Sequence, residues 1–190
     1  MDNGGGKMSI NIKDELKFDS KKGEVTIQGH RIVLASASLL LSIHMELIDT
    51  IGAVAGTLLY TASKNAAAEE TKTALDKMPL LKLLAKTDWG KKELVNQWIP
   101  IFNSFGVGAL EVVEINPKER IVVRVNNSYS SVCYREMCVK STQPLCHLLR
   151  GLFAGGFSVL LKTDYDAEEV KCASKGDPYC EFVLTPVKKI

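Results

Sequence analysis

Five cysteines, Cys133, Cys138, Cys146, Cys172 and Cys180, all fall in the last third of this 190-residue chain. Free cysteine packs like a small hydrophobic residue, so five buried thiols are the simplest interpretation. The count is odd and the N-terminus lacks the apolar core of a signal peptide, which argues against a secreted disulfide framework. Because thiolates are also favoured ligands of transition metals, the cluster indicates a metal or redox site to be weighed against simple burial.

Two of these cysteines flank a turn. Cys172 and Cys180 are equidistant from Gly176, and Gly176-Asp177 is a turn signal. In a tight hairpin the two residues would be cross-strand neighbours with Cβ atoms about 4.5–5.5 Å apart. That geometry suits two thiolates sharing a metal or a strained disulfide, and it equally suits two inert thiols on one face of a sheet.

Further ligand types lie close to this pair. Cys146 falls in the first turn of a helix expected over 142–161, where the helix dipole favours a thiolate. A carboxylate could complete a three-thiolate zinc site. Strand alternation places Glu168, rather than Glu169, on the face of Cys172, although a bulge or a strand start would reverse that choice.

The first half of the chain is mainly helical in pattern. Residues 24–34 alternate well enough for one or two short strands around Gly29. Ser36 or Ser38 can cap a following apolar helix. The expected helices cover 39–50, 53–75 and 90–105, the last disturbed at Pro100, with a short apolar segment after Pro79.

The second half changes to a period of two. Residues 109–115 and 120–125 form two strands joined by a turn, and 128–139 is either a third strand or a connection. A helix capped by Ser141 or Thr142 runs through Leu161, and a last hairpin covers 165–173 and 179–184. Helices gathered in the first half and strands in the second predict an α+β fold, with an antiparallel sheet packed against helices.

Composition limits the partners. Lys and Arg number 24 against 22 Asp and Glu, so the formal net charge is +2, and no basic run marks a nucleic-acid binder by itself. No apolar run approaches the roughly 18 residues of a membrane span. We expect a cytoplasmic protein with a flexible N-terminal segment over 1–19 and a single domain over 20–190.

Several segments together resemble a known family. Residues 171–182 resemble the C-terminal signature of the 4-vinyl reductase domain family, and 146–157 resemble its helix that runs from a cysteine into glycines. Residues 23–34 resemble its opening strands, so the resemblance covers about 20–186. The family includes archaeal stand-alone proteins, an accessory protein of bacteriochlorophyll synthesis and sensor domains of phenol-responsive activators, and its fold is similar to that of TRAPP subunits.

The resemblance implies a site and a function. In the aromatic sensors, Cys, Glu, Cys and Cys hold a zinc beside a buried pocket, and the matching positions are Cys146, Glu169, Cys172 and Cys180. The family spacing thus selects Glu169 over Glu168. Four protein ligands would leave no open coordination position, so the zinc is expected to be structural. The implied function is binding or sensing of a hydrophobic or aromatic small molecule.

Two alternatives to a sensor stay open. One is an accessory protein or enzyme of tetrapyrrole or other cofactor metabolism, although no catalytic constellation is present in the sequence. The other is a dimeric interaction module like the TRAPP subunits. The chain has no Walker loop and no helix-turn-helix pattern, so it is not a complete activator. Cys133 and Cys138 lie outside the implied site, where burial is their simplest role.

The stretch from Leu39 to Leu59 is apolar on more than one helical face. A surface helix of a monomer normally shows a single apolar stripe, so the excess must pack under other helices or against a second chain. We therefore expect a homodimer. Gly151, Gly155 and Gly156, in a later apolar helix, predict close packing of that helix on the sheet or on a neighbouring helix.

Overall fold

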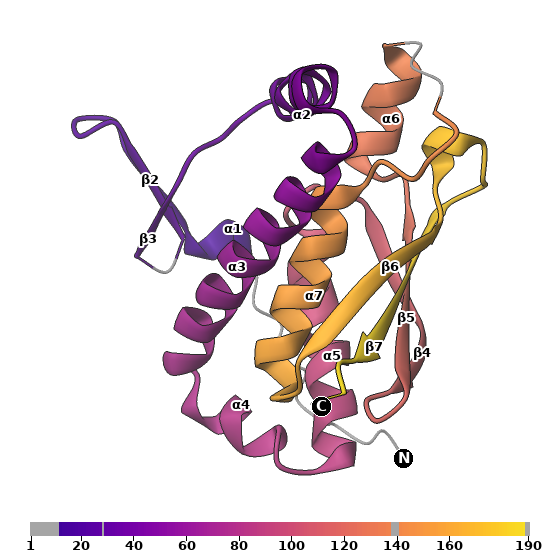
Figure 1. Ribbon diagram of the computed structural model, residues 1–190. Coiled ribbons are helices and arrows are strands. Elements are labelled where there is room, and N and C mark those ends of the chain that lie inside the picture. Colours follow the sequence, from indigo (N-terminus) through magenta and orange to yellow (C-terminus); the bar gives the residue numbers. More distant parts are fainter. Residues whose placement is uncertain (1–11, 28, 138–140, 189–190) are drawn as a thin grey trace, which may run out of the picture.

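The computed structural model describes residues 12–27, 29–137 and 141–188. Its N-terminal part is a small antiparallel sheet that stands beside the main body (Figure 1). Strand β2 lies between β1 and β3, and Gly29 allows the turn before β3 because its φ is +79°. These elements are α1 (Ile12–Glu15), β1 (Leu16–Asp19), β2 (Glu24–Ile27) and β3 (His30–Ile32).

Four helices follow, and their starts agree with the local sequence. The Ser36 side chain accepts a hydrogen bond from the Leu39 N–H, and that of Thr87 accepts one from the Gly90 N–H. The fourth helix continues through Pro100. Their bounds are α2 (Ala37–Ile51), α3 (Val54–Asp76), α4 (Pro79–Leu84) and α5 (Asp88–Asn103).

The second sheet is antiparallel and has the strand order β4-β5-β7-β6. Central strand β5 alternates strictly, and Ile121, Val123 and Val125 on its inner face are fully buried. The bounds are β4 (Ala109–Asn116), β5 (Arg120–Asn126), β6 (Tyr165–Lys171) and β7 (Cys180–Pro186).

Helix α7 (His147–Leu161) is the centre of the fold, packed against α3 on one side and β6 on the other (Figure 1). Its glycines explain the close approach to α3. A Cβ atom on Gly151 would lie 2.3 Å from the Tyr60 carbonyl oxygen, and one on Gly155 would lie 2.0 Å from the Lys64 carbonyl oxygen. The expectation of close helix packing is therefore confirmed.

The α+β class, the early helices, both hairpins and the strands of 24–34 agree with the sequence analysis. Residues 128–139 do not, because Tyr129–Glu136 form helix α6 instead of a strand or a connection. The helix expected from residue 142 begins only at His147. Residues 12–19, expected to belong to a flexible segment, instead form α1 and β1, and β1 pairs with β2.

Among the described residues, no helix is both long enough and apolar enough to cross a lipid bilayer.

Candidate functional site

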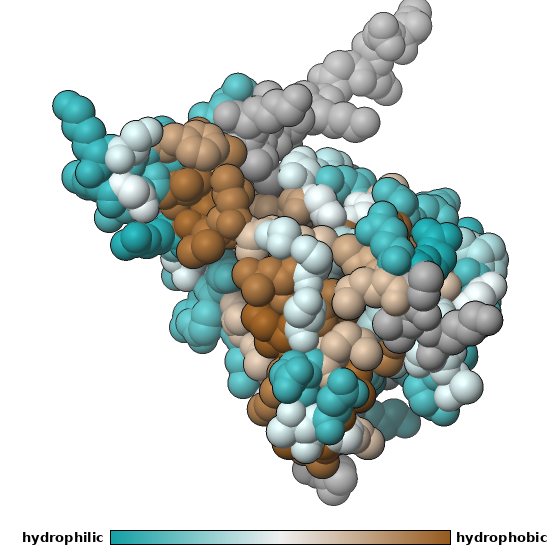
Figure 2. All heavy atoms as spheres, turned by 90° about the horizontal axis from the view of Figure 1, so that it is seen from above, coloured by the Kyte–Doolittle hydropathy of each residue, from teal (hydrophilic) through white to brown (hydrophobic). Residues whose placement is uncertain are grey.

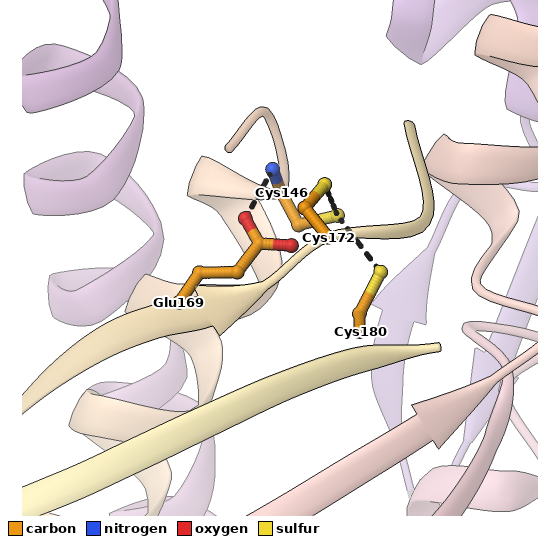
Figure 3. A group of neighbouring side chains, drawn as sticks. All are labelled: Cys146, Glu169, Cys172 and Cys180. Carbon is orange, nitrogen blue, oxygen red and sulfur yellow. Dashed lines mark hydrogen bonds between the residues drawn. The ribbon is translucent and has the colours of Figure 1, made fainter. Parts of the chain in front are cut away.

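Four side chains from distant parts of the sequence meet at one end of the main sheet: Cys146, Glu169, Cys172 and Cys180. All four are buried, and one potential ligand atom from each lies within 4.8 Å of the others. Figure 3 shows the three thiols and the carboxylate facing a common point between α7 and the β6–β7 hairpin. The structure thus brings together the set that the family spacing indicated.

Each residue is positioned by the end of an element. Cys146 is the N-cap residue of α7, and its N–H donates a 2.9 Å hydrogen bond to Glu169 Oε2. Cys172 follows β6 and precedes a short 3-10 turn (Ala173–Lys175), while Cys180 begins β7. The Cys172 N–H is fixed by Asp177 Oδ2 at 2.8 Å.

The choice between the two glutamates is settled by the geometry of β6. Glu169 is 6% exposed and shares the inner face with Ala167, whereas Glu168 is exposed. A register shift lies between Glu169 and Lys171, and this irregularity brings Glu169 to the side of Cys172. Simple alternation counted back from Cys172 was therefore wrong.

The distances fit a thiolate-rich metal site. Cys146 Sγ lies 3.9 Å from Cys172 Sγ and 3.7 Å from Cys180 Sγ. Tetrahedral zinc with Zn–S bonds of about 2.3 Å requires sulfur–sulfur separations of about 3.8 Å. Glu169 Oε1, moreover, is buried and has no hydrogen-bond partner among the described residues. The residues present therefore fit a tetrahedral Cys₃Glu zinc centre.

The protonation of the four groups is strongly coupled. Burial, with the negative charge of Cys172, raises the pKa of Glu169 to about 8. Hydrogen bonds from Cys146 and Cys180 lower the pKa of Cys172, and hydrogen bonding to Cys172 raises that of Cys146. Without a cation, one thiolate is thus held by neighbouring S–H groups, whereas a bound divalent ion would favour ionisation of all four ligands.

Helix α6 places hydroxyl groups against the cluster. Ser130 Oγ lies 3.0 Å from Cys146 Sγ, and Ser131 Oγ lies 3.1 Å from Cys180 Sγ. On the opposite side, Ser174 Oγ lies 2.8 Å from Cys172 Sγ. The sequence analysis assigned no role to these serines because it did not identify α6 as a helix.

A buried histidine lies close to the cluster. His44 of α2 is 3% exposed, and its Nδ1 lies 3.0 Å from the Tyr134 hydroxyl oxygen of α6. The His44 ring also contacts the His147 ring, with centroids 5.4 Å apart. Burial, followed by the nearby His147, lowers the pKa of His44 to about 4, so this ring is neutral near pH 7.

A separate cavity of about 460 Å³ lies between the small sheet and helices α3, α5 and α7. Its walls are mainly apolar, and His30, Arg31 and Glu70 supply polar groups. The apolar lining includes Ile32, Ala74, Trp98, Phe102, Phe105 and Leu152. Of the aromatic residues that sequence reasoning considered as core or pocket, Phe153 and Phe157 lie in the core instead.

The other two cysteines do not join the cluster. Cys133 is a half-buried free thiol that packs beside Leu41, Tyr134 and Leu145. Cys138 lies outside the described residues. The expectation that burial is their simplest role agrees with the position of Cys133.

Two known families match different parts of the chain. The 4-vinyl reductase domain matches residues 125–186, which contain all four members of the cluster. The family described as activator of aromatic catabolism matches residues 11–79, which form the small sheet and helices α2 and α3.

Individual proteins give the same picture. Uncharacterized protein MJ0150 of Methanocaldococcus jannaschii is 33% identical over 94 residues, which are 50% of this chain and 51% of that protein. Uncharacterized protein MJ0745 of the same organism is 26% identical over 101 residues, 53% of each chain. The chain therefore spans about half the length of the curated relatives it matches.

Solved structures extend the likeness to the fold of nearly the whole chain. The phenol-responsive sensory domain of the transcription activator PoxR, solved with phenol, superposes with a TM-score of 0.74 at 21% identity, covering 92% of this chain and 86% of that one. A trafficking protein particle complex subunit 3 from Naegleria fowleri, covalently bound to palmitic acid, gives 0.56 at 13% identity, covering 81% and 96%. The resemblance indicated by the sequence is thus confirmed: the chain carries a 4-vinyl reductase domain over residues 125–186, in a fold shared with an aromatic-sensor domain and a TRAPP subunit.

Proposed function

We propose that this chain is a small-molecule-binding sensor domain whose ligand is hydrophobic or aromatic. The observation that carries the proposal is the cavity of about 460 Å³, which lies within the usual range of ligand pockets, about 300–1,000 Å³. Support also comes from the fold shared with the PoxR sensory domain, which was solved with phenol, and from the match to an activator of aromatic catabolism.

The lining of the cavity indicates how such a ligand would be held. Trp98 and Phe102 of α5 provide flat apolar walls, and Ile32 of β3 contributes from the small sheet. Polar groups are confined to His30, Arg31 and Glu70 on the exposed side, together with the buried Thr71. A ligand with an apolar body and one hydrogen-bonding end fits this distribution.

A cavity-filling substitution tests this assignment. Ala74→Trp on α3 places a large ring in the cavity, while Ala62→Trp places the same ring on the exposed side of that helix. With phenol and the fluorophore 1-anilinonaphthalene-8-sulfonate as probes, we expect Ala74→Trp to abolish saturable binding and Ala62→Trp to retain it. Equal binding by both variants, or no saturable binding by the unmodified chain, would contradict the proposal.

We propose further that the cluster holds one structural zinc ion. Cys146, Glu169, Cys172 and Cys180 would fill all four positions of a tetrahedral site, which leaves none for substrate or water. A bound ion would fasten the start of α7 to both strands of the β6–β7 hairpin. The bond between the Cys146 N–H and Glu169 shows that these elements already meet at this point.

The apolar surface of α2 supports a homodimer as the assembled state. Leu39, Leu40 and Ile43 are 53%, 40% and 51% exposed, and Val54 and Leu58 of α3 are 65% and 50% exposed. Figure 2, which views the molecule from the α2 side, shows hydrophobic residues gathered on this face. Because monomers rarely expose large contiguous apolar patches, a second copy of the chain would cover this one.

A further inference from the structure

Helix α6 begins directly against the cysteine cluster. Ser130 and Ser131 lie in its first turn and are 4% and 1% exposed. Consecutive helical residues point about 100° apart, yet each of these hydroxyls reaches a sulfur, since Cys146 and Cys180 both lie at the start of α6. Ser128 extends the contact, because its hydroxyl lies 2.9 Å from that of Ser130.

The charge of a loaded site explains why such hydroxyls are needed. Three thiolates, one carboxylate and a divalent cation leave a formal charge of about −2 in a buried position. Within the described residues, no lysine or arginine forms an ion pair with Glu169. Hydrogen bonds to ionised acceptors are stronger than neutral ones, so hydroxyl donors are the groups that can stabilise this charge.

The same helix holds α2. Its Tyr134 hydroxyl contacts His44 Nδ1 at 3.0 Å, and Tyr134 packs with Leu41 and Leu145 in a small apolar cluster. A second support for α2 is the His147 ring, which follows Cys146 directly and contacts the His44 ring. Both polar supports of α2 therefore start beside cluster residues.

We propose that Ser130 and Ser131 donate hydrogen bonds to the thiolates of Cys146 and Cys180 in the metal-loaded protein, and that the metal thereby fixes α6 and, through it, helix α2. This inference rests on the proposed metal site and adds positioning residues and a consequence. The consequence is that the apolar face of α2, the surface assigned above to a second copy, is held in place only when the site is loaded. Partner binding would then depend on the metal.

Zinc affinity tests the first half of this proposal. In competition with a chromophoric zinc chelator, we expect the double substitution Ser130→Ala and Ser131→Ala to weaken zinc binding about 10- to 100-fold. The control Val132→Ala shortens a half-buried side chain of the same helix without touching a hydroxyl, so its affinity should stay within about twofold. If the unmodified chain binds no zinc, the metal site itself is wrong; if it binds zinc and the serine variant binds equally well, only this inference is wrong.

Amide hydrogen exchange tests the second half on the unmodified chain and needs no folded variant. Removing zinc with a chelator should accelerate exchange in α6 and in Leu41–Ile48 of α2 at least about tenfold, and much less in Leu59–Leu75 of α3. In Tyr134→Phe, α2 should exchange fast in both states while zinc affinity is nearly unchanged. Exchange in α2 that ignores the metal, or equal acceleration in α2 and α3, would overturn the coupling.

Discussion

The two sheets of this protein differ in how completely they bury their apolar side chains. Strand β5 of the four-stranded sheet buries Ile121, Val123 and Val125 fully beneath α7. In the small sheet, by contrast, every residue of β1, β2 and β3 that the structure describes is half-buried or exposed, and Phe18 is 62% exposed. The region around α7 therefore completes its own interior, whereas the small sheet and α2 leave apolar surface for a ligand or a second chain.

This difference assigns separate roles to the two regions. The region of α7 contains the Cys₃Glu cluster and the largest buried core, so changes there should act on global stability. The small sheet supplies one wall of the cavity, and α2 exposes apolar side chains, so changes there should act on ligand or partner binding. Substitutions in the two regions should therefore be distinguishable by what they disturb.

The largest effect is expected at the contact between α7 and α3. In Gly155→Ala the added methyl group would lie 2.0 Å from the Lys64 carbonyl oxygen, a backbone atom that cannot move aside locally. We expect a loss of about 3 kcal/mol in the free energy of unfolding, measured by urea denaturation. The adjacent Gly156→Ala is the control, because its nearest neighbour would be Thr71 Oγ1 at 3.5 Å, and it should be neutral or slightly stabilising. Equal losses in both variants would show that this contact does not hold the core together.

Loss of a cluster residue should come next. Cys180→Ala removes a proposed metal ligand and should lower Tm by roughly 10 °C, because metal binding contributes folding free energy. Cys133→Ala truncates a thiol outside the cluster and should cost only about 1 kcal/mol. Differential scanning calorimetry with and without a chelator checks both variants. Small and equal shifts would argue that the cluster is merely a set of packed thiols.

Association should respond to the exposed face of α2 and leave the metal site intact. Leu40→Asp places a charge in the patch that includes Leu39 and Ile43, and it should weaken a dimer by at least about 100-fold, or about 2.7 kcal/mol. Sedimentation equilibrium at micromolar concentration checks this result, with zinc content measured in parallel. An unmodified chain that sediments near its monomer mass of 20.9 kDa would refute the dimer.

The smallest effect is expected from pH. The pKa of His44 is lowered to about 4 in the folded protein, while an unfolded chain has an ordinary histidine pKa of about 6.5. Protonation therefore favours the unfolded chain, and stability should fall, on the order of 2 kcal/mol, as the pH drops from about 6.5 toward 4. Tyr134 and His147 face this ring, and His147 titrates in both proteins, so the test is the smaller decline expected in His44→Phe. Parallel declines would remove His44 from the account.

Much of the fold follows from local sequence. Alternation predicted both hairpins of the main sheet, and the cap at Ser36 with the apolar run after it predicted α2. Helix α6 was missed because Tyr129-Ser-Ser-Val-Cys-Tyr134 is rich in residues of weak helix propensity. What stabilises it is tertiary: its serines contact the cysteines, and Tyr134 contacts His44, and neither contact can be identified before the fold is known.

The cluster shows the same limit on a smaller scale. Spacing alone placed Cys172 and Cys180 together, because a tight turn is a local feature. It could not choose Glu169, because that choice depends on the register shift before Lys171. It also placed Cys146 one turn inside a helix, whereas the Cys146 N–H bonds to Glu169 and the helix starts after it.

The central claim is that the region around α7 is completed by one metal ion, and elemental analysis tests it most directly. The chain, purified without chelators or added metal, should contain one equivalent of zinc per polypeptide by inductively coupled plasma mass spectrometry, and the Cys180→Ala variant should contain far less. Less than about 0.2 equivalents of any transition metal in the unmodified chain would contradict the account.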